Sequence, residues 1–162
     1  ADGSGKAPLT FQMHDCYGTQ YAMNSTTTNN GGWTSCAMRQ THLPAILTLM
    51  PTEVQNGIRE VDKLTSAGSA SDTINTTADK LFLLSEIEIY GRVIWSKSGE
   101  GTQYGYYKAG NSTVKNYNGS AKYWPERSPY KDNAMFFCGV QTHGGEGYLP
   151  GGAYYVAFAF CF

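Results

Sequence analysis

Apolar and polar residues alternate near the beginning of the chain, and apolar residues fill its end. In LTFQMH, residues 9–14, Leu9, Phe11 and Met13 alternate with polar residues, which is the pattern of a half-buried strand. The final segment, AYYVAFAFCF (residues 153–162), is apolar at nearly every position and predicts a strand with material packed on both faces. We therefore expect the two terminal strands to pair in one sheet.

A helical pattern follows the sequence NNGGW. One apolar helical face is formed by residues at spacings of three and four positions: Leu43, Ile46, Leu47 and Met50. We expect Thr34 or Ser35 to provide the N-cap oxygen. Pro44 is expected to kink the segment or to begin a second helical piece within it.

The middle of the chain predicts strands separated by long loops. Residues 58–66 predict a strand, residues 67–79 a polar loop, and residues 80–91 a strong strand in which Ile87 and Ile89 alternate with Glu86 and Glu88. Residues 93–123 are rich in Gly, Tyr, Asn and Ser without either period, and they predict a functional loop region. Residues 134–140 predict a strand that pairs with the final one.

Composition restricts the domain count and the partners. A chain of 162 residues with 41% hydrophobic content has the material for one core, and we assign residues 9–162 to one domain and residues 1–8 to a linker or a cloning remnant. A formal charge of -1 provides no basic field for a nucleic acid. The apolar runs are shorter than the roughly 20 residues of a membrane helix, so no membrane insertion is expected.

Cysteines and acidic residues are the first candidates for chemistry. Four cysteines, at positions 16, 36, 138 and 161, lack metal-ligand spacing, and buried thiols are favoured over disulfides, which stay open as an alternative. Glu86 and Glu88 resemble a carboxylate pair, but an alternating strand with an exposed polar face explains them better. A nucleophile elbow and a phosphate-binding loop are absent from the sequence. We predict no catalytic residue, no cofactor and no bound metal.

Several segments in a fixed order carry a family resemblance. They are GGWTSCAMR, ADKLFLLSEIEIYG, YWPERSPY, FFCGVQTHGG and YYVAFAFCF. Together they resemble a family of uncharacterised bacterial and phage proteins with a C-type-lectin-like domain. The resemblance implies an α+β fold with a mixed or antiparallel sheet, paired N- and C-terminal strands, two helices and long irregular loops.

The same resemblance extends to the variable proteins of diversity-generating retroelements, such as the major tropism determinant of a phage. In those proteins the final part of the chain carries a ligand-facing surface that is rewritten by mutagenesis. Carried over to residues 123–162, the ligand-binding, variable positions are Tyr123, Glu126, Tyr130, Lys131, Asn133, Met135, Phe137, Gln141, His143, Tyr148, Leu149, Tyr154 and Tyr155. The core positions between them are Trp124, Arg127, Phe136, Cys138, Val140, Val156, Phe158 and Phe160. We expect Arg127 to brace a loop.

The implied function is recognition by a Tyr-rich surface, because Tyr with Ser, Gly and Asn is the composition of antibody loops. The partner would be a protein or glycan receptor on a cell surface, and the protein would lie on a phage virion tail or a bacterial cell surface. The sequence lacks the EPN-, QPD- and WND-like tripeptides of calcium-dependent lectins. Two alternatives remain: a cysteine oxidase similar to formylglycine-generating enzymes, using Cys138 and Cys161, and a structural tip domain whose aromatic face forms a homo-oligomer interface.

Overall fold

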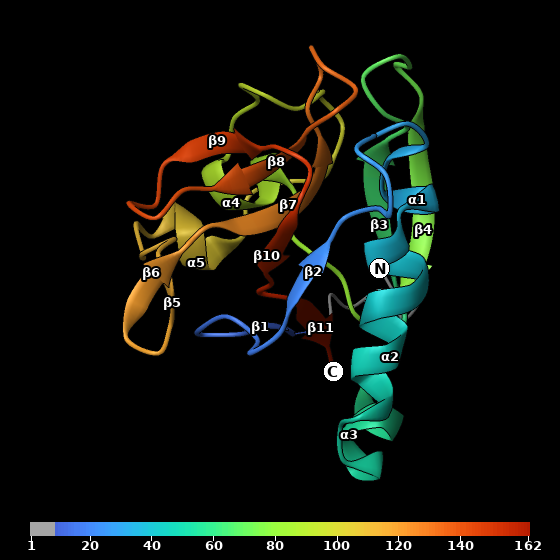
Figure 1. Ribbon diagram of the computed structural model, residues 1–162. Coiled ribbons are helices and arrows are strands. Elements are labelled where there is room, and N and C mark those ends of the chain that lie inside the picture. Colours follow the sequence, from blue (N-terminus) through green and yellow to red (C-terminus); the bar gives the residue numbers. More distant parts are fainter. Residues whose placement is uncertain (1–8) are drawn as a thin grey trace.

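The computed structural model describes residues 9–162, so the linker predicted at residues 1–8 lies outside the described part. The fold is α+β, with short helices and small antiparallel sheets (Figure 1). The strands are β1 (Thr10–Gln12), β2 (Gln20–Ala22), β3 (Val61–Ser66), β4 (Ile74–Asp79), β5 (Lys115–Tyr117), β6 (Ser120–Lys122), β7 (Trp124–Pro129), β8 (Phe137–Val140), β9 (Glu146–Leu149), β10 (Ala153–Tyr155) and β11 (Ala159–Cys161). The helices are α1 (Gly32–Ser35), the π-helical turn η1 (Met38–His42), α2 (Leu43–Thr48), α3 (Thr52–Gly57), α4 (Glu86–Tyr90) and α5 (Gly105–Lys108).

The terminal strands pair as the sequence predicts. β1 runs antiparallel to β11, with Thr10 opposite Cys161. On its other side β11 forms isolated bridges from Cys161 to Arg59 and from Ala159 to Phe82. The apolar end of the chain is therefore held by neighbours on both edges. It is not one strand, however, because β10 pairs with β2 while β11 pairs with β1.

The segment around Pro44 is helical in three consecutive pieces. Pro44 lies in the first turn of α2, where its missing N–H costs no intrahelical hydrogen bond. The predicted cap is wrong, because α1 begins after Gly31 and neither Thr34 nor Ser35 caps a helix. Gly31 has φ 81, a conformation that favours glycine over a capping serine or threonine.

The segment predicted as a polar loop contains a strand. β3 confirms the strand expected in residues 58–66, and β4 pairs with it along its whole length, from Val61 opposite Asp79 to Ser66 opposite Ile74. Ile, Thr and Asn residues in β4 form a surface strand that gains its order from β3, which polar composition alone does not reveal.

The predicted strand SEIEIY is a helix. Ser85 caps α4: its hydroxyl accepts a hydrogen bond from the Glu88 amide, and the Glu88 carboxylate accepts one from the Ser85 amide. This capping box overrides the two-residue alternation of Ile87 and Ile89. Glu86 and Glu88 are buried, so the interpretation of an exposed polar face was wrong.

The sheet β7–β8–β9 lies apart from the terminal strands. β8 pairs with β7 and with β9, so the predicted pairing of residues 134–140 with the final strand is wrong. Every residue of β7 and of β8 is buried. Between Tyr90 and Trp124 the chain forms α5 and the β5–β6 hairpin, so the expected loop region has some regular structure.

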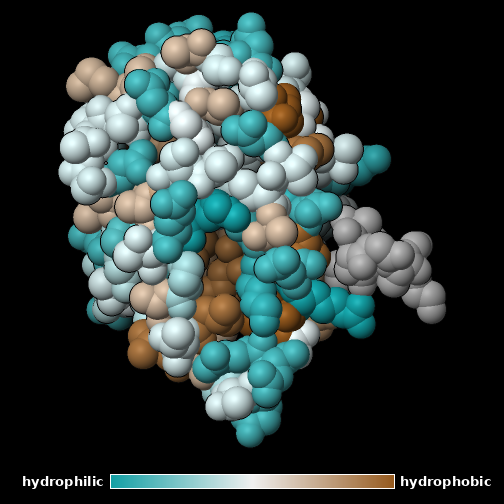
Figure 2. Space-filling view, turned by 90° about the vertical axis from the view of Figure 1, so that its right-hand side faces the viewer, coloured by the Kyte–Doolittle hydropathy of each residue, from teal (hydrophilic) through white to brown (hydrophobic). Residues whose placement is uncertain are grey.

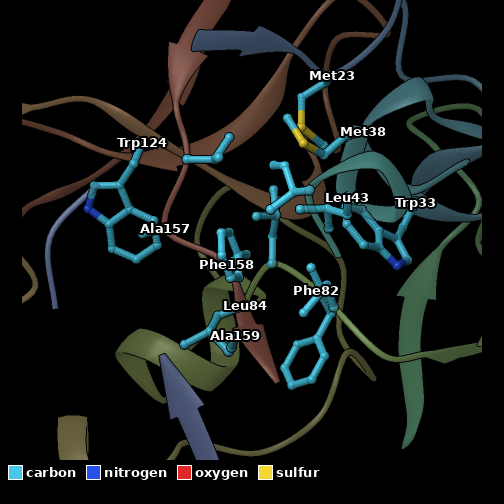
Figure 3. Close-up of a cluster of buried hydrophobic side chains, with 14 of the residues drawn as sticks. Met23, Trp33, Met38, Leu43, Phe82, Leu84, Trp124, Ala157, Phe158 and Ala159 are labelled. Atoms are coloured by element: carbon cyan, nitrogen blue, oxygen red, sulfur yellow. The ribbon is translucent and has the colours of Figure 1, made fainter. Parts of the chain in front are cut away.

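One core joins these parts. In Figure 1, α1, α2 and the β3–β4 hairpin form one side of the molecule, the β7–β8–β9 sheet with α4 and α5 forms the other, and β2, β10 and β11 lie between them. Figure 3 shows side chains from all three regions meeting in the centre, among them Trp33, Leu43, Phe82, Trp124 and Phe158. Burial of this apolar surface is the main stabilising contribution.

The four thiols are buried and free, as predicted. Burial raises the pKa of Cys16 to about 11 and that of Cys36 to about 12. Among residues 9–162, no helix has the length and apolar character needed to cross a membrane. The same residues contain no group of three or more His, Cys, Asp and Glu side chains placed to hold a metal ion.

One apolar hollow lies beside α2. Figure 2 views this side of the molecule and shows a hydrophobic floor bordered by hydrophilic residues. A pocket of about 360 Å³ between α2 and the end of β4 has Leu43, Leu47 and Leu81 among its lining residues, with Arg39 and Asp79 also in its wall.

Candidate functional site

Four aromatic rings, from different loops and strands, contact one another at the surface. The Tyr130 and Tyr148 rings stack with centroids 4.8 Å apart and an interplanar angle of 3°. Phe136 stacks on Tyr148 at 5.1 Å, and Trp95 meets Tyr148 edge-on at 5.5 Å. Tyr148 is 43% exposed, while the other three rings are half-buried. We call Trp95, Tyr130, Phe136 and Tyr148 the aromatic cluster.

A buried carboxylate positions Trp95. The Glu86 side chain is 1% exposed and accepts hydrogen bonds from the backbone amides of Ile94, Trp95 and Ser96, each at 3.0 Å. The Ser96 hydroxyl donates a further bond to Glu86 at 2.7 Å. These bonds fix the backbone that carries the indole, and the Lys131 amide, which bonds to the Trp95 carbonyl at 2.8 Å, ties this loop to the one after β7.

A buried amide fixes the loop that carries Tyr130 and Phe136. The Asn29 side chain is fully buried, and its Nδ2 donates to the carbonyls of Tyr130 at 3.0 Å, Asn133 at 3.1 Å and Phe136 at 2.7 Å. Its Oδ1 accepts from the Ser69 amide at 3.1 Å. Every polar atom of Asn29 is therefore used to hold the loop in one conformation, which preorganises the aromatic cluster.

A pocket of about 290 Å³, which we call the loop pocket, lies beside the aromatic cluster. Its walls come from the Ser/Thr/Asn-rich loop at residues 22–28, from Met135 and Phe137, and from residues 149–154. A second, shallower hollow is lined by Tyr123, Gln141, Tyr148, Leu149, Pro150 and Tyr154. Leu149, Pro150 and Tyr154 belong to both, and Tyr148 joins the shallower hollow to the aromatic cluster. The three features form one continuous surface.

Most of the residues expected to face a ligand meet on this surface. They are Tyr123, Tyr130, Met135, Phe137, Gln141, Tyr148, Leu149 and Tyr154. Phe137 and Leu149 are buried, at 4% and 5% exposure, and contribute only to the walls. Lys131 lines a neighbouring hollow with Ser96 and Lys97, and Asn133 lies in the loop that Asn29 holds.

Besides Lys131 and Asn133, three more expected positions do not line this surface. Glu126 is fully buried in β7, so its assignment to the ligand surface is wrong. Tyr155 stacks on Tyr117 at 4.5 Å, next to β5. His143 is exposed in the turn between β8 and β9 and lines none of these hollows. Phe136, expected in the core, is instead a member of the aromatic cluster.

Arg127 braces loop backbone in the interior, as predicted. It is 0% exposed, and its guanidinium donates to the carbonyls of Leu64, Leu83 and Glu100. It also donates to the Glu88 carboxylate, to which Lys63 donates at 3.0 Å. Burial raises the pKa of Glu88, but the charges of Arg127 and Lys63 outweigh burial and lower it.

Unlike Glu88, the buried acid Glu126 lacks hydrogen-bond partners for its side chain within residues 9–162. Neither of its carboxylate oxygens has a hydrogen-bond partner among the described residues. Burial, together with the charges of Glu86, Glu100 and Glu146, raises its pKa well above the usual carboxyl range. The neutral acid is the form that such a site favours, because an ionised carboxylate without a partner is costly to bury.

Comparison with known proteins identifies one family. Residues 10–154 match a family described as a domain of unknown function, DUF6273. The chain belongs to this family. No curated protein and no solved structure matches the chain.

The sequence did not predict that two parts of this DUF6273 domain would contribute to the surface. Trp95 lies inside the loop region that the sequence flags only as a whole, and nothing in its neighbourhood predicts contact with Tyr130. The loop at residues 22–28 has an ordinary polar composition. Both join the site through tertiary contacts. The Lys131 amide bonds to the Trp95 carbonyl, and Asn29, next to the loop at residues 22–28, donates to the Tyr130 carbonyl.

Proposed function

We propose that this domain is a non-enzymatic recognition module with a C-type-lectin-like fold, and that it binds a protein or glycan receptor on a cell surface. We propose further that it is a variable protein of a phage or bacterial diversity-generating retroelement, located on a virion tail or a bacterial surface. The observation that carries the proposal is the aromatic cluster with the two adjoining hollows. Exposed aromatic rings on loops held from beneath are typical of recognition surfaces.

The architecture supports this proposal in two ways. The terminal strands β1 and β11 pair with each other, and helices and long loops lie between them in the sequence. The family resemblance implies this arrangement. Asn29 and Glu86 hold the loops of the surface from the interior, so side chains on the surface can change while the backbone beneath them is kept.

The buried thiols argue against the cysteine oxidase alternative. A reactive thiol needs exposure and a nearby positive charge. Cys138 is 0% and Cys161 2% exposed, and burial raises the pKa of Cys138 well above the usual thiol range.

Sequencing this locus in many isolates tests the proposed variability. We expect substitutions to concentrate at positions that line the surface, such as Tyr123, Tyr130, Tyr148 and Tyr154, and to spare Asn29. A uniform distribution of substitutions along the chain would exclude diversification.

Binding to arrays of bacterial cells and surface glycans tests recognition itself. Exchanging both Tyr130 and Tyr148 for Ala removes the stacked pair, and loss of an aromatic anchor costs about 2 kcal/mol or more, which is about a 30-fold weaker affinity. Tyr106→Ala is the matched control, because Tyr106 is 57% exposed and lies outside this surface. Equal weakening by the control, or unfolding of the double variant, would contradict the assignment.

A further inference from the structure

Another pocket, between β1 and α5, lies away from the recognition surface. Its volume is about 350 Å³, within the range of small-molecule sites, and its walls come from β1, α5, the segment leading into β5 and Leu84. It shares no lining residue with the loop pocket or with the aromatic cluster. Its apolar walls are formed by Met13, Leu84, Val114 and the rings of Tyr104, Tyr106 and Tyr107.

The pocket contains a buried cation with no acidic partner. Lys115 is 6% exposed, and its Nζ donates to the carbonyls of Met13 and His14. Within residues 9–162, no carboxylate lies within ion-pair distance of Lys115, whereas Lys63, equally buried, is paired with Glu88 at 3.0 Å. The Nζ of Lys115 also lies 5.6 Å from the centroid of the Trp124 ring, a cation–π contact. An ammonium group has three N–H donors, so one N–H of Lys115 is left without an acceptor within the described part of the chain.

A second unused donor belongs to Tyr104. Its hydroxyl oxygen accepts hydrogen bonds from Lys63 Nζ at 2.9 Å and from Thr10 Oγ1 at 3.5 Å. The hydroxyl proton of Tyr104 has no acceptor among the described residues. Tyr104 and Lys115 therefore both offer donors and no acceptor to a ligand in this pocket.

Two other polar side chains of the wall, Gln12 and Tyr107, already form hydrogen bonds within the protein. Gln12 Nε2 donates to the Ala157 carbonyl at 3.1 Å, and Gln12 Oε1 accepts the hydroxyl hydrogen bond of Tyr107. This leaves Tyr107 and Gln12 fixed as a rigid side of the pocket. A rigid pocket loses little conformational entropy when a ligand binds.

We propose that this pocket binds a small carboxylate with a flat, apolar body. The carboxylate takes the free donors of Lys115 and Tyr104 and gives the Lys115 ammonium an anionic partner, because charge-assisted hydrogen bonds are the strong ones in a partly buried site. The apolar body replaces water against Met13, Leu84 and the tyrosine rings. This site is separate from the proposed recognition surface, so either can fail without the other.

Three probes of matched size separate the effect of ligand charge on binding from that of ligand shape: the anion benzoate, the neutral benzamide and the cation benzylamine. Backbone amide shifts in two-dimensional NMR spectra report where each probe binds. We expect benzoate to shift amides of β1 and of residues 104–115, with an affinity at least tenfold higher than that of benzamide and no saturable binding of benzylamine. Equal affinities for the three probes, or benzoate shifts confined to other parts of the chain, would overturn the proposal.

Substitutions then assign the donors. Lys115→Met removes the charge at nearly constant volume and should weaken benzoate binding about tenfold or more, whereas Lys115→Arg should retain most of it. Tyr104→Phe removes only the hydroxyl and should weaken binding several-fold. Tyr148→Ala, on the recognition surface, should leave benzoate binding unchanged.

Circular dichroism melts check that each variant folds. If Lys115→Met does not fold, Tyr104→Phe and the comparison of the three probes decide the question. Unchanged benzoate affinity in a folded Lys115→Met or Tyr104→Phe variant would refute the assignment of that donor.

Discussion

The unpaired acid Glu126 predicts a distinctive pH dependence of stability. Glu126 is fully buried without a hydrogen-bond partner, and burial followed by the neighbouring acids raises its native pKa. In the unfolded chain the same carboxyl ionises at its ordinary pKa of about 4.3. Above that pH the unfolded state loses a proton that the native state keeps. The native state is therefore destabilised as the pH rises toward the native pKa of Glu126.

The size of the expected stability change follows from a difference of one bound proton between the native and unfolded states. A difference of one bound proton changes the free energy of unfolding by about 1.4 kcal/mol per pH unit. Glu126→Gln has nearly the same shape and does not ionise. We expect this variant to match the wild type near pH 4 and to become more stable than the wild type, by about 1.4 kcal/mol for each further pH unit, until the native pKa is reached.

Urea unfolding followed by Trp fluorescence measures this difference at intervals from pH 4 to pH 8. Glu100, whose pKa burial also raises, and His42, whose pKa burial lowers, contribute to the absolute curve. The contribution of His42 cancels when the two curves are subtracted, and that of Glu100 cancels as long as native Glu126 is neutral. The exposed Glu53→Gln is the control and should follow the wild type at every pH. Parallel curves for Glu126→Gln and the wild type would refute the reasoning, and a difference that grows toward acid would show an ionised, stabilised Glu126.

Three further predictions concern the scaffold. Arg127→Lys keeps the charge but loses the planar fork that serves three carbonyls, and we expect a loss of about 3–5 kcal/mol in thermal or urea unfolding; a change below about 1 kcal/mol would contradict the bracing role. Gly32→Ala places a Cβ 2.0 Å from the Ser66 carbonyl oxygen at φ +56 and should cost more than about 2 kcal/mol, whereas Gly105→Ala, with open space, should cost little; equal melting temperatures would disprove this. All four cysteines should resist a thiol reagent in the native state and react after unfolding, and rapid native labelling of Cys138 would favour the enzyme alternative.

Periodicity along the chain predicted the elements whose environment is simple. Alternation at residues 9–14 and the apolar end of the chain were sufficient to predict the β1–β11 pairing, because a strand apolar on both faces must lie among neighbours. Apolar flanks around Cys138 and Cys161 predicted buried thiols. Pro44 predicted the division of the helical segment, since proline is tolerated only in a first turn.

Other segments contained two conflicting local signals. SEIEIY combines strand-like alternation with a capping box, and the capping box determined the structure because it satisfies two helix-end amides at once. The polar composition of residues 67–79 concealed β4, whose order comes from pairing with β3. At Phe136 and Phe137 alternation assigned the wrong ring to the core, because every residue of β8 is enclosed.

The sequence by itself determined that the fold is α+β with paired ends, a Tyr-rich final quarter and buried thiols. Only the tertiary structure decided which aromatic rings meet, because the Lys131 amide bonds to the Trp95 carbonyl and so joins two loops that are far apart in the sequence. It also decided which charges are paired. Lys63 and Lys115 are equally buried, yet Glu88 faces only Lys63, and no local pattern records which carboxylate a folded chain brings within reach.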